Sequence, residues 1–138
     1  MVTTARDIMT QDVQCVKESQ TLVDAARKMR DLDVGALPIC GDDDRLKGII
    51  TDRDIVIRCL AAEGDPATTT AGSLADGKPV TIGADDPVDD VLETMAEYQV
   101  RRLPVIDGHR LVGIISEADI ARYAPDEEVA DTIQAVTQ

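Results

Sequence analysis

Two short segments, residues 48–54 and 113–119, combine residue types that could bind a nucleotide. Each reads glycine, two apolar residues, a hydroxyl-bearing residue (Thr51 or Ser116), two variable residues and an aspartate. The hydroxyl could bond a phosphate or ribose oxygen, and the aspartate, one turn later, could accept both hydroxyls of a ribose diol. If each segment runs from a strand into a helix, the free backbone N–H groups at the helix start would favour an anion.

The same residues also have a purely structural interpretation. Thr51 with Asp54, and Ser116 with Asp119, match the capping box that closes an ordinary helix start without any ligand. A capping box does not account for the glycine and the two apolar residues that precede it in both copies. Glycine at that place would let a ligand or another stretch of backbone approach closely.

The two segments belong to a longer internal repeat. A shift of 66 residues places Ala5 on Ala71, and deletion of one loop residue then places Arg45 on Arg110. Such a long unit holds several elements, unlike a solenoid repeat, and a duplicated unit duplicates any site that it carries. We expect a first repeat at 1–62, a linker at 63–70, a second repeat at 71–124 and a tail at 125–138.

The length, aromatic content and charge of the chain limit its core and the kinds of molecule that it could bind. The 138 residues suit one compact domain or two small packed halves, and the near absence of aromatic residues predicts an aliphatic core without base-stacking platforms. A net charge of −13 repels nucleic acid and anionic lipid, although acidity also serves solubility. We therefore expect no nucleic-acid or membrane partner, and an anionic ligand would need local arginines or amides.

Other functional signals are weak. No stretch is long and apolar enough for a membrane span, and the N-terminus lacks a signal-peptide pattern, so we expect a cytoplasmic protein. The three cysteines form no CxxC pair, and the single His109 lies in a polar turn, which is a poor set of zinc ligands. Without a Cys–His pair, a metal-ligand cluster or a GxSxG motif, we expect no enzyme activity, no catalytic residues and no metal site.

Each repeat predicts the same order of elements: helical turn, strand, helix, strand, strand, helix. In the first repeat these are a turn at 5–9 capped by Asp7, a strand at 13–16, a helix from the capping box at 21–24 to about Asp33, a hairpin of strands at 36–40 and 45–50, and a helix from Thr51. In the second repeat the long helix begins at Asp86, with Pro87 as its first residue.

This order predicts an α+β fold made of two pseudo-symmetric units. Each unit should have the element order β-α-β-β-α, and the two units should pack sheet to sheet. The first strand and the strand after the helix should be parallel neighbours through a right-handed crossover. One such unit buries little surface alone, which favours packing of two. In the tail, Val129, Ile133 and Val136 are spaced as on one helix face, so this segment is either a docking helix or a frayed end.

The paired repeats resemble tandem cystathionine β-synthase domains, usually called a CBS pair, over roughly residues 5–123. The resemblance lies in the TARDIM opening, the LPI and LPV strands and the GIITDRDI and GIISEADI segments. It implies adenosine-containing ligands (AMP, ADP, ATP, S-adenosylmethionine or NAD) in two clefts between the repeats, and dimers shaped as a flat disc. It also implies that Asp54 and Asp119 bind ribose, and that Thr51 and Ser116 contact ribose or phosphate.

The arginines near the two motifs differ between the repeats. Arg101 and Arg102 precede the second LP strand where the first repeat has Gly-Ala, and Arg53 lies in the first motif where the second has Ala118. Because an arginine offers a permanently charged fork of donors, we expect Arg101 or Arg102, with Arg53 as a further candidate, to hold a phosphate. The alternative is that these side chains pair with surface carboxylates.

Cys15 and Cys40 fall on the two strands that we expect to be parallel neighbours in the first repeat. A disulfide is geometrically feasible if their Cα atoms lie within about 7 Å. A reducing cytosol favours free thiols for this pair instead. Cys59, on a helix face, is expected to be a core residue.

Together these features favour a stand-alone regulatory module that senses an adenine nucleotide, requires no cofactor and acts as a homodimer. Ligand binding would shift the balance between two packings, and an unknown protein partner would detect the change. The alternatives are a structural or stress-related dimer whose clefts stay empty, and a detached regulatory fragment of an enzyme or channel.

Overall fold

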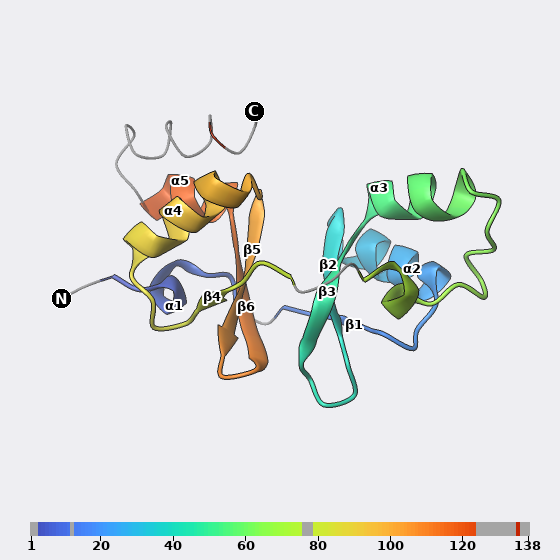
Figure 1. The fold of residues 1–138 in the computed structure, drawn as a ribbon, viewed down its shortest axis with the longest axis horizontal. Coiled ribbons are helices and arrows are strands. Elements are labelled where there is room, and N and C mark those ends of the chain that lie inside the picture. Colours follow the sequence, from blue (N-terminus) through green and yellow to red (C-terminus); the bar gives the residue numbers. More distant parts are fainter. Residues whose placement is uncertain (1–2, 12, 76–78, 124–134, 136–138) are drawn as a thin grey trace. The chain divides into compact units, whose positions relative to one another are not determined.

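The computed structural model describes residues 3–11, 13–75, 79–123 and 135. The chain divides into two compact units, each with its own three-stranded sheet (Figure 1). Unit 1 comprises Met1–Val13 and Val80–Gln138, and unit 2 comprises Gln14–Pro79. The α+β class and the repeated β-α-β-β-α order predicted from the sequence are confirmed.

Unit 2 contains the sheet β1-β2-β3, in which β1 runs parallel to β2 and β2 antiparallel to β3. The predicted parallel neighbours are thus confirmed. The elements are β1 (Val16–Lys17), α2 (Leu22–Leu32), β2 (Ala36–Cys40), β3 (Leu46–Thr51), the single turn α3 (Asp52–Asp54), the π-helix η1 (Ile55–Leu60) and the 3-10 helix η2 (Ala71–Leu74).

Helix α2 begins and ends where local chemistry places it. Thr21 Oγ1 accepts a hydrogen bond from the Asp24 backbone N–H at 3.2 Å, and Asp24 Oδ2 accepts one from the Thr21 N–H at 3.1 Å. The helix ends at Asp33, which adopts a left-handed conformation with φ of 55°. Both bounds agree with the sequence-based prediction.

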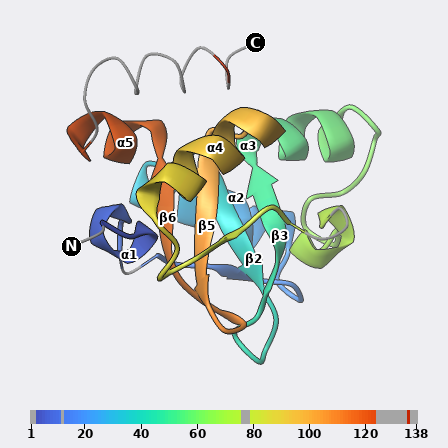
Figure 2. The same ribbon diagram turned by 60° about the vertical axis from the view of Figure 1, so that its left-hand side comes forward.

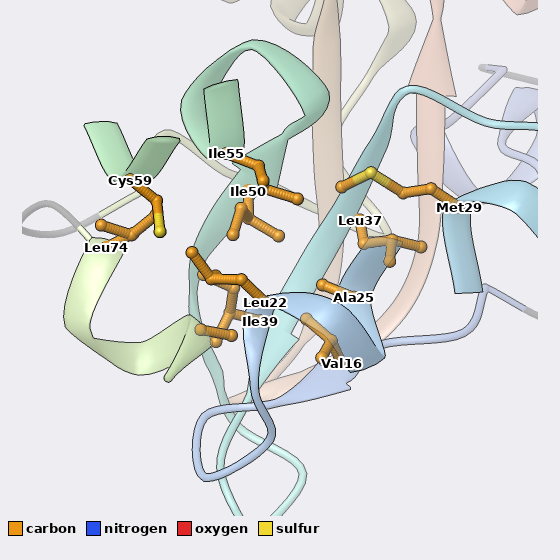
Figure 3. Packing of buried hydrophobic residues seen from close by; sticks show 11 residues of the cluster. Val16, Leu22, Ala25, Met29, Leu37, Ile39, Ile50, Ile55, Cys59 and Leu74 are labelled. Carbon is orange, nitrogen blue, oxygen red and sulfur yellow. The ribbon is translucent and has the colours of Figure 1, made fainter. Parts of the chain in front are cut away.

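The core of unit 2 lies between α2 and the sheet. In Figure 3 the side chains of Leu22 and Ala25 from α2 gather with Ile39 and Ile50 from the sheet, all four fully buried. Cys59 also belongs to this cluster, as predicted, and is a free thiol. The cluster contains no aromatic side chain.

Unit 1 repeats this architecture with the sheet β4-β5-β6. Helix α4 contacts β5, and α1 contacts both β6 and α5 (Figure 2). The elements are α1 (Ala5–Ile8), β4 (Ile82–Gly83), α4 (Val88–Tyr98), β5 (Arg102–Asp107), β6 (Arg110–Ser116) and α5 (Glu117–Tyr123). The core is again aliphatic, with Val91, Met95, Leu103 and Ile115 fully buried.

The helical turn that opens each sequence repeat packs on the sheet of the other repeat. The segment after α1 pairs with β6 in unit 1, where Thr10 N–H donates to Ile114 O at 2.8 Å and Ile114 N–H donates back at 3.1 Å. In unit 2, η2 lies against β1 and β3, and Gly72 N–H donates to Glu18 O at 2.9 Å. The compact units are therefore offset from the sequence repeats.

Several predicted bounds need correction. The first strand is Val16–Lys17 rather than 13–16, because only these residues pair with β2. Helix α1 is capped by Thr4, whose N–H donates to the Asp7 carboxylate, so Asp7 lies inside the helix. Pro87 is the N-cap of α4 rather than its first residue, and Asp86 instead accepts from Gly83 N–H at 2.9 Å. The tail prediction falls outside the described residues.

Cys15 and Cys40 are joined in a disulfide, in place of the free thiols that a reducing cytosol favours. Their Cα atoms lie 5.8 Å apart, diagonally across the parallel pair formed by Val16 and Ile39. Of the helices in the described ranges, none combines the length and apolar character of a bilayer-spanning segment.

Candidate functional site

The first motif lies at the end of β3 in unit 2. Thr51 Oγ1 accepts from the Asp54 N–H at 3.0 Å, and Asp54 Oδ2 accepts from the Thr51 N–H at 2.9 Å. Asp54 is partly buried, and within the described residues its carboxylate accepts no other hydrogen bond. Its Oδ1 atom is therefore without a donor from the described part of the chain.

The second motif, in unit 1, has the same capping box in a more crowded setting. Asp119 Oδ2 accepts from the Ser116 N–H at 2.9 Å and from Ser116 Oγ at 3.1 Å. The hydroxyl of Thr10 donates to Asp119 Oδ1 at 3.0 Å and lies 3.2 Å from Oδ2. The Arg122 guanidinium also bonds Oδ1, and the Asp119 residue is only 3 % exposed.

Both hydroxyl–acid pairs thus form capping boxes, as the structural interpretation predicts. The preceding glycines also have a structural cause. A Cβ on Gly113 would lie 2.9 Å from the Thr10 carbonyl oxygen, and a Cβ on Gly48 would lie 3.1 Å from the Ala75 Cβ. Each glycine therefore makes room for the segment that follows α1 or η2, the helical turn that packs on the sheet of the other repeat. The presence of the glycine does not by itself indicate a ligand.

A sequence profile of the CBS domain matches residues 5–60 and 71–126, and thus contains both motifs. The chain belongs to the CBS domain family. A sequence relative, hypoxic response protein 1 of Mycobacterium tuberculosis, is 55% identical over 135 residues, which cover 98% of this chain and 94% of the relative. The resemblance inferred from the motifs is confirmed.

Solved CBS structures share this fold. The crystal structure of hypoxic response protein I with two coordinated zinc ions has a TM-score of 0.83 and 59% identity, covering 89% of this chain and all of that one. The CBS domain pair of protein MJ0100 in complex with 5′-methylthioadenosine and S-adenosyl-L-methionine has a TM-score of 0.75 and 29% identity, with 88% and 95% coverage. CBSX2 in complex with AMP has a TM-score of 0.74 and 26% identity, with 86% and 93% coverage.

Within the residues that the structure describes, this chain offers a poor donor set for zinc. Among its described residues, no three His, Cys, Asp or Glu side chains come together in a group that could hold a metal ion. The single histidine, His109, is exposed in the turn between β5 and β6, and Cys15 and Cys40 are bound to each other. The donors present therefore do not fit a zinc site within the described part of this protein.

The candidate phosphate-binding arginines are all exposed. Arg102, the first residue of β5, pairs across the sheet with Ser116, whereas Ala36 occupies the corresponding place opposite Thr51. Arg101 directly precedes β5, and Arg53 lies in α3. The described residues provide no ion pair for the side chains of these three arginines, so the alternative of surface carboxylate partners is not seen there.

Sequence reasoning missed two residues at the second motif. Thr10 is 109 positions from Asp119, so no local pattern links them. Arg122 follows Asp119 by three residues, and this helical spacing of opposite charges could have identified it. Glu117 is also notable, because its Oε1 atom is buried without a hydrogen-bond partner among the described residues.

A separate hollow of about 350 Å³ opens on unit 2 between α2 and η1. Its lining is mostly apolar, including Leu22, Ala26, Ile55 and Leu60, with Arg27 among the polar residues. It does not include Thr51 or Asp54. This hollow is therefore distinct from the motif that carries the hydroxyl and the acid.

Proposed function

We propose that this CBS pair is a regulatory module that binds an adenosine-containing ligand at its two hydroxyl–acid motifs. The observation that carries the proposal is the carboxylate of Asp54, held in place by the Thr51 N–H with Oδ1 left without a donor from the described residues. A ribose diol supplies two hydroxyl donors that suit such an acceptor. The adenosine-type ligands of the CBSX2 and MJ0100 structures support the same assignment.

Arginines supply the phosphate contact in this proposal. Arg102 stands across the ladder from Ser116, so a ligand that contacts the Ser116 hydroxyl lies within range of its guanidinium. Arg101 and Arg53 are further candidates, since both are exposed and lack ion pairs with described residues. The protein has a net charge of −13, which repels an anionic ligand, and these arginines offset that repulsion locally.

The output of the module is a change in its own conformation or in a dimer interface. A ligand shifts such an equilibrium only by as much as its affinity differs between the two states. The proposal includes a cytoplasmic homodimer that acts on a separate protein partner, with the nucleotide as regulatory ligand and without catalysis. Light scattering with and without AMP tests the dimer and its response.

Calorimetric titration of AMP, ATP, NAD and S-adenosylmethionine tests ligand binding directly. Arg102 lies opposite Ser116, so Arg101→Ala combined with Arg102→Ala should weaken AMP binding at the second motif by about 10- to 100-fold, the value of one charge-assisted hydrogen bond. Adenosine, which lacks the phosphate, should bind both proteins equally. Arg45→Ala with Arg110→Ala changes the net charge by the same amount beside the two hairpin turns and should leave AMP affinity unchanged. Equal losses in both double variants would refute the phosphate assignment.

A structural role in stress is the second candidate. It is favoured by the name of the relative, hypoxic response protein 1, and by the fact that both motifs serve as capping boxes without a ligand. On this alternative the protein is a dimer that binds none of the four compounds. Absence of heat in every titration, from a protein that is folded and dimeric, would support the structural role.

A further inference from the structure

The two motif aspartates differ in how many hydrogen-bond donors they already hold. A carboxylate has about four lone-pair sites for hydrogen bonds. Asp119 accepts from four donors: the Ser116 N–H, the Ser116 hydroxyl, the Thr10 hydroxyl and the Arg122 guanidinium. Among the residues that the structure describes, Asp54 accepts from one donor, the Thr51 N–H. Asp119 is thus saturated, whereas Asp54 has sites to spare.

Two of the four donors on Asp119 could be replaced by a ligand. The Ser116 groups belong to the capping box itself and are local to the helix start. Thr10 comes from the exchanged N-terminal segment, which is fastened to β6 by the paired bonds with Ile114. The Arg122 side chain is 69% exposed while the Asp119 side chain is 2% exposed, so the guanidinium covers the carboxylate from the solvent side.

The first repeat has neither of these replaceable donors in its sequence. Ile57 occupies the position that corresponds to Arg122, and it carries no hydrogen-bonding group. The position that corresponds to Thr10 is Asp76, whose ionised carboxylate has no proton to donate. The difference between the two motifs is therefore encoded in residues outside the motifs.

We infer that Thr10 and Arg122 act as an internal lock on the second motif, so that a ribose diol binds first at Asp54. This inference rests on the proposed adenosine function and assigns an order to its two sites. At the second motif, the diol must displace the Thr10 hydroxyl and the Arg122 guanidinium before it can bond Asp119. At the first motif it directly bonds the lone pairs of Asp54 to which no described residue donates.

Calorimetry with AMP on the full chain tests the order of binding. The unmodified protein should show one tight event per chain, and Asp54→Asn should weaken that event at least tenfold. Thr10→Val combined with Arg122→Met removes both replaceable donors at nearly constant volume. This double variant should bind a second AMP at least tenfold more tightly than the unmodified protein does. Thr10→Ser with Arg122→Lys, which retains a hydroxyl and a cation, should behave as the unmodified protein.

Three outcomes would overturn the lock. If Asp119→Asn removes the tight event and Asp54→Asn does not, the order is reversed while the adenosine function stands. If the double variant folds by circular dichroism and gains no second event, the lock is absent. If neither the unmodified protein nor the double variant binds AMP or the other adenosine ligands, the proposed function and the lock both fail. Should the double variant not fold, Asp54→Asn alone assigns the tight event.

Discussion

Reduction of the Cys15–Cys40 disulfide should destabilise unit 2 by a predictable amount. The bridge closes a loop between residues 25 positions apart in the sequence. The loop-closure entropy of a chain of that length corresponds to about 3.5 kcal/mol at 25 °C, because reduction frees the unfolded chain to explore more conformations. This is a large share of the stability of a small unit. The melting temperature should fall by roughly 10 °C if both units unfold together, and by about twice that if unit 2 unfolds alone.

The loss should appear first at β1, which is the weakest part of the sheet. Its ladder consists of two residue pairs, Val16 with Ile39 and Lys17 with Cys40. The next bond is from Glu18 N–H to Cys40 O at 2.9 Å, so the amide of Glu18 should exchange faster with solvent after reduction. Differential scanning calorimetry with and without a phosphine reductant, followed by amide exchange, measures both effects.

Cys15→Ala provides the matched control for this experiment. The variant lacks the bridge, so its melting temperature should be lower than that of the oxidised protein and unaffected by the reductant. Thiol counting establishes the starting state: one free thiol, from the buried Cys59, before reduction and three after it. An unchanged melting temperature on complete reduction would refute the loop-closure argument, and three free thiols before reduction would refute the disulfide itself.

Three further predictions concern single positions. Thr21→Ala removes the cap of α2 and should cost about 0.5–2 kcal/mol in urea unfolding, with Thr21→Ser close to neutral; a neutral alanine would show that the cap contributes nothing. Gly113→Ala places a Cβ 2.9 Å from the Thr10 carbonyl oxygen and should speed amide exchange at Thr10, whereas unchanged exchange would contradict this close approach. The backbone N–H of Arg45 donates to the Asp43 carboxylate and lowers its pKa below the ordinary value of 3.8. This hydrogen bond therefore stabilises the turn above pH 3.8, and the stabilisation is lost as the pH falls through the folded pKa. An NMR titration that finds an ordinary pKa for Asp43 would refute this.

Elements defined by short-range chemistry were predictable from the sequence. The Thr21–Asp24 box and the left-handed Asp33 bound α2 through contacts within a few residues, and the alternation of turn and apolar residues located both hairpins. The first strand was misplaced because an isolated apolar stretch, residues 13–16, does not reveal which of its backbone groups will find partners on β2. Pro87 was misplaced by one residue, a shift that local propensity does not resolve.

The candidate site divides in the same way. Sequence alone established the two hydroxyl–acid pairs and their place at strand-to-helix corners, since each pair interacts over three residues. Only the tertiary structure brought Thr10 onto Asp119, across 109 positions, and set it beside Arg122. The N-terminal segment packs on β6 of the second repeat because backbone groups of Thr10 and Ile114, far apart in the chain, pair with each other. The side chains of these two residues do not reveal this pairing in the sequence. Two motifs that read alike in sequence therefore differ in the donors that surround them.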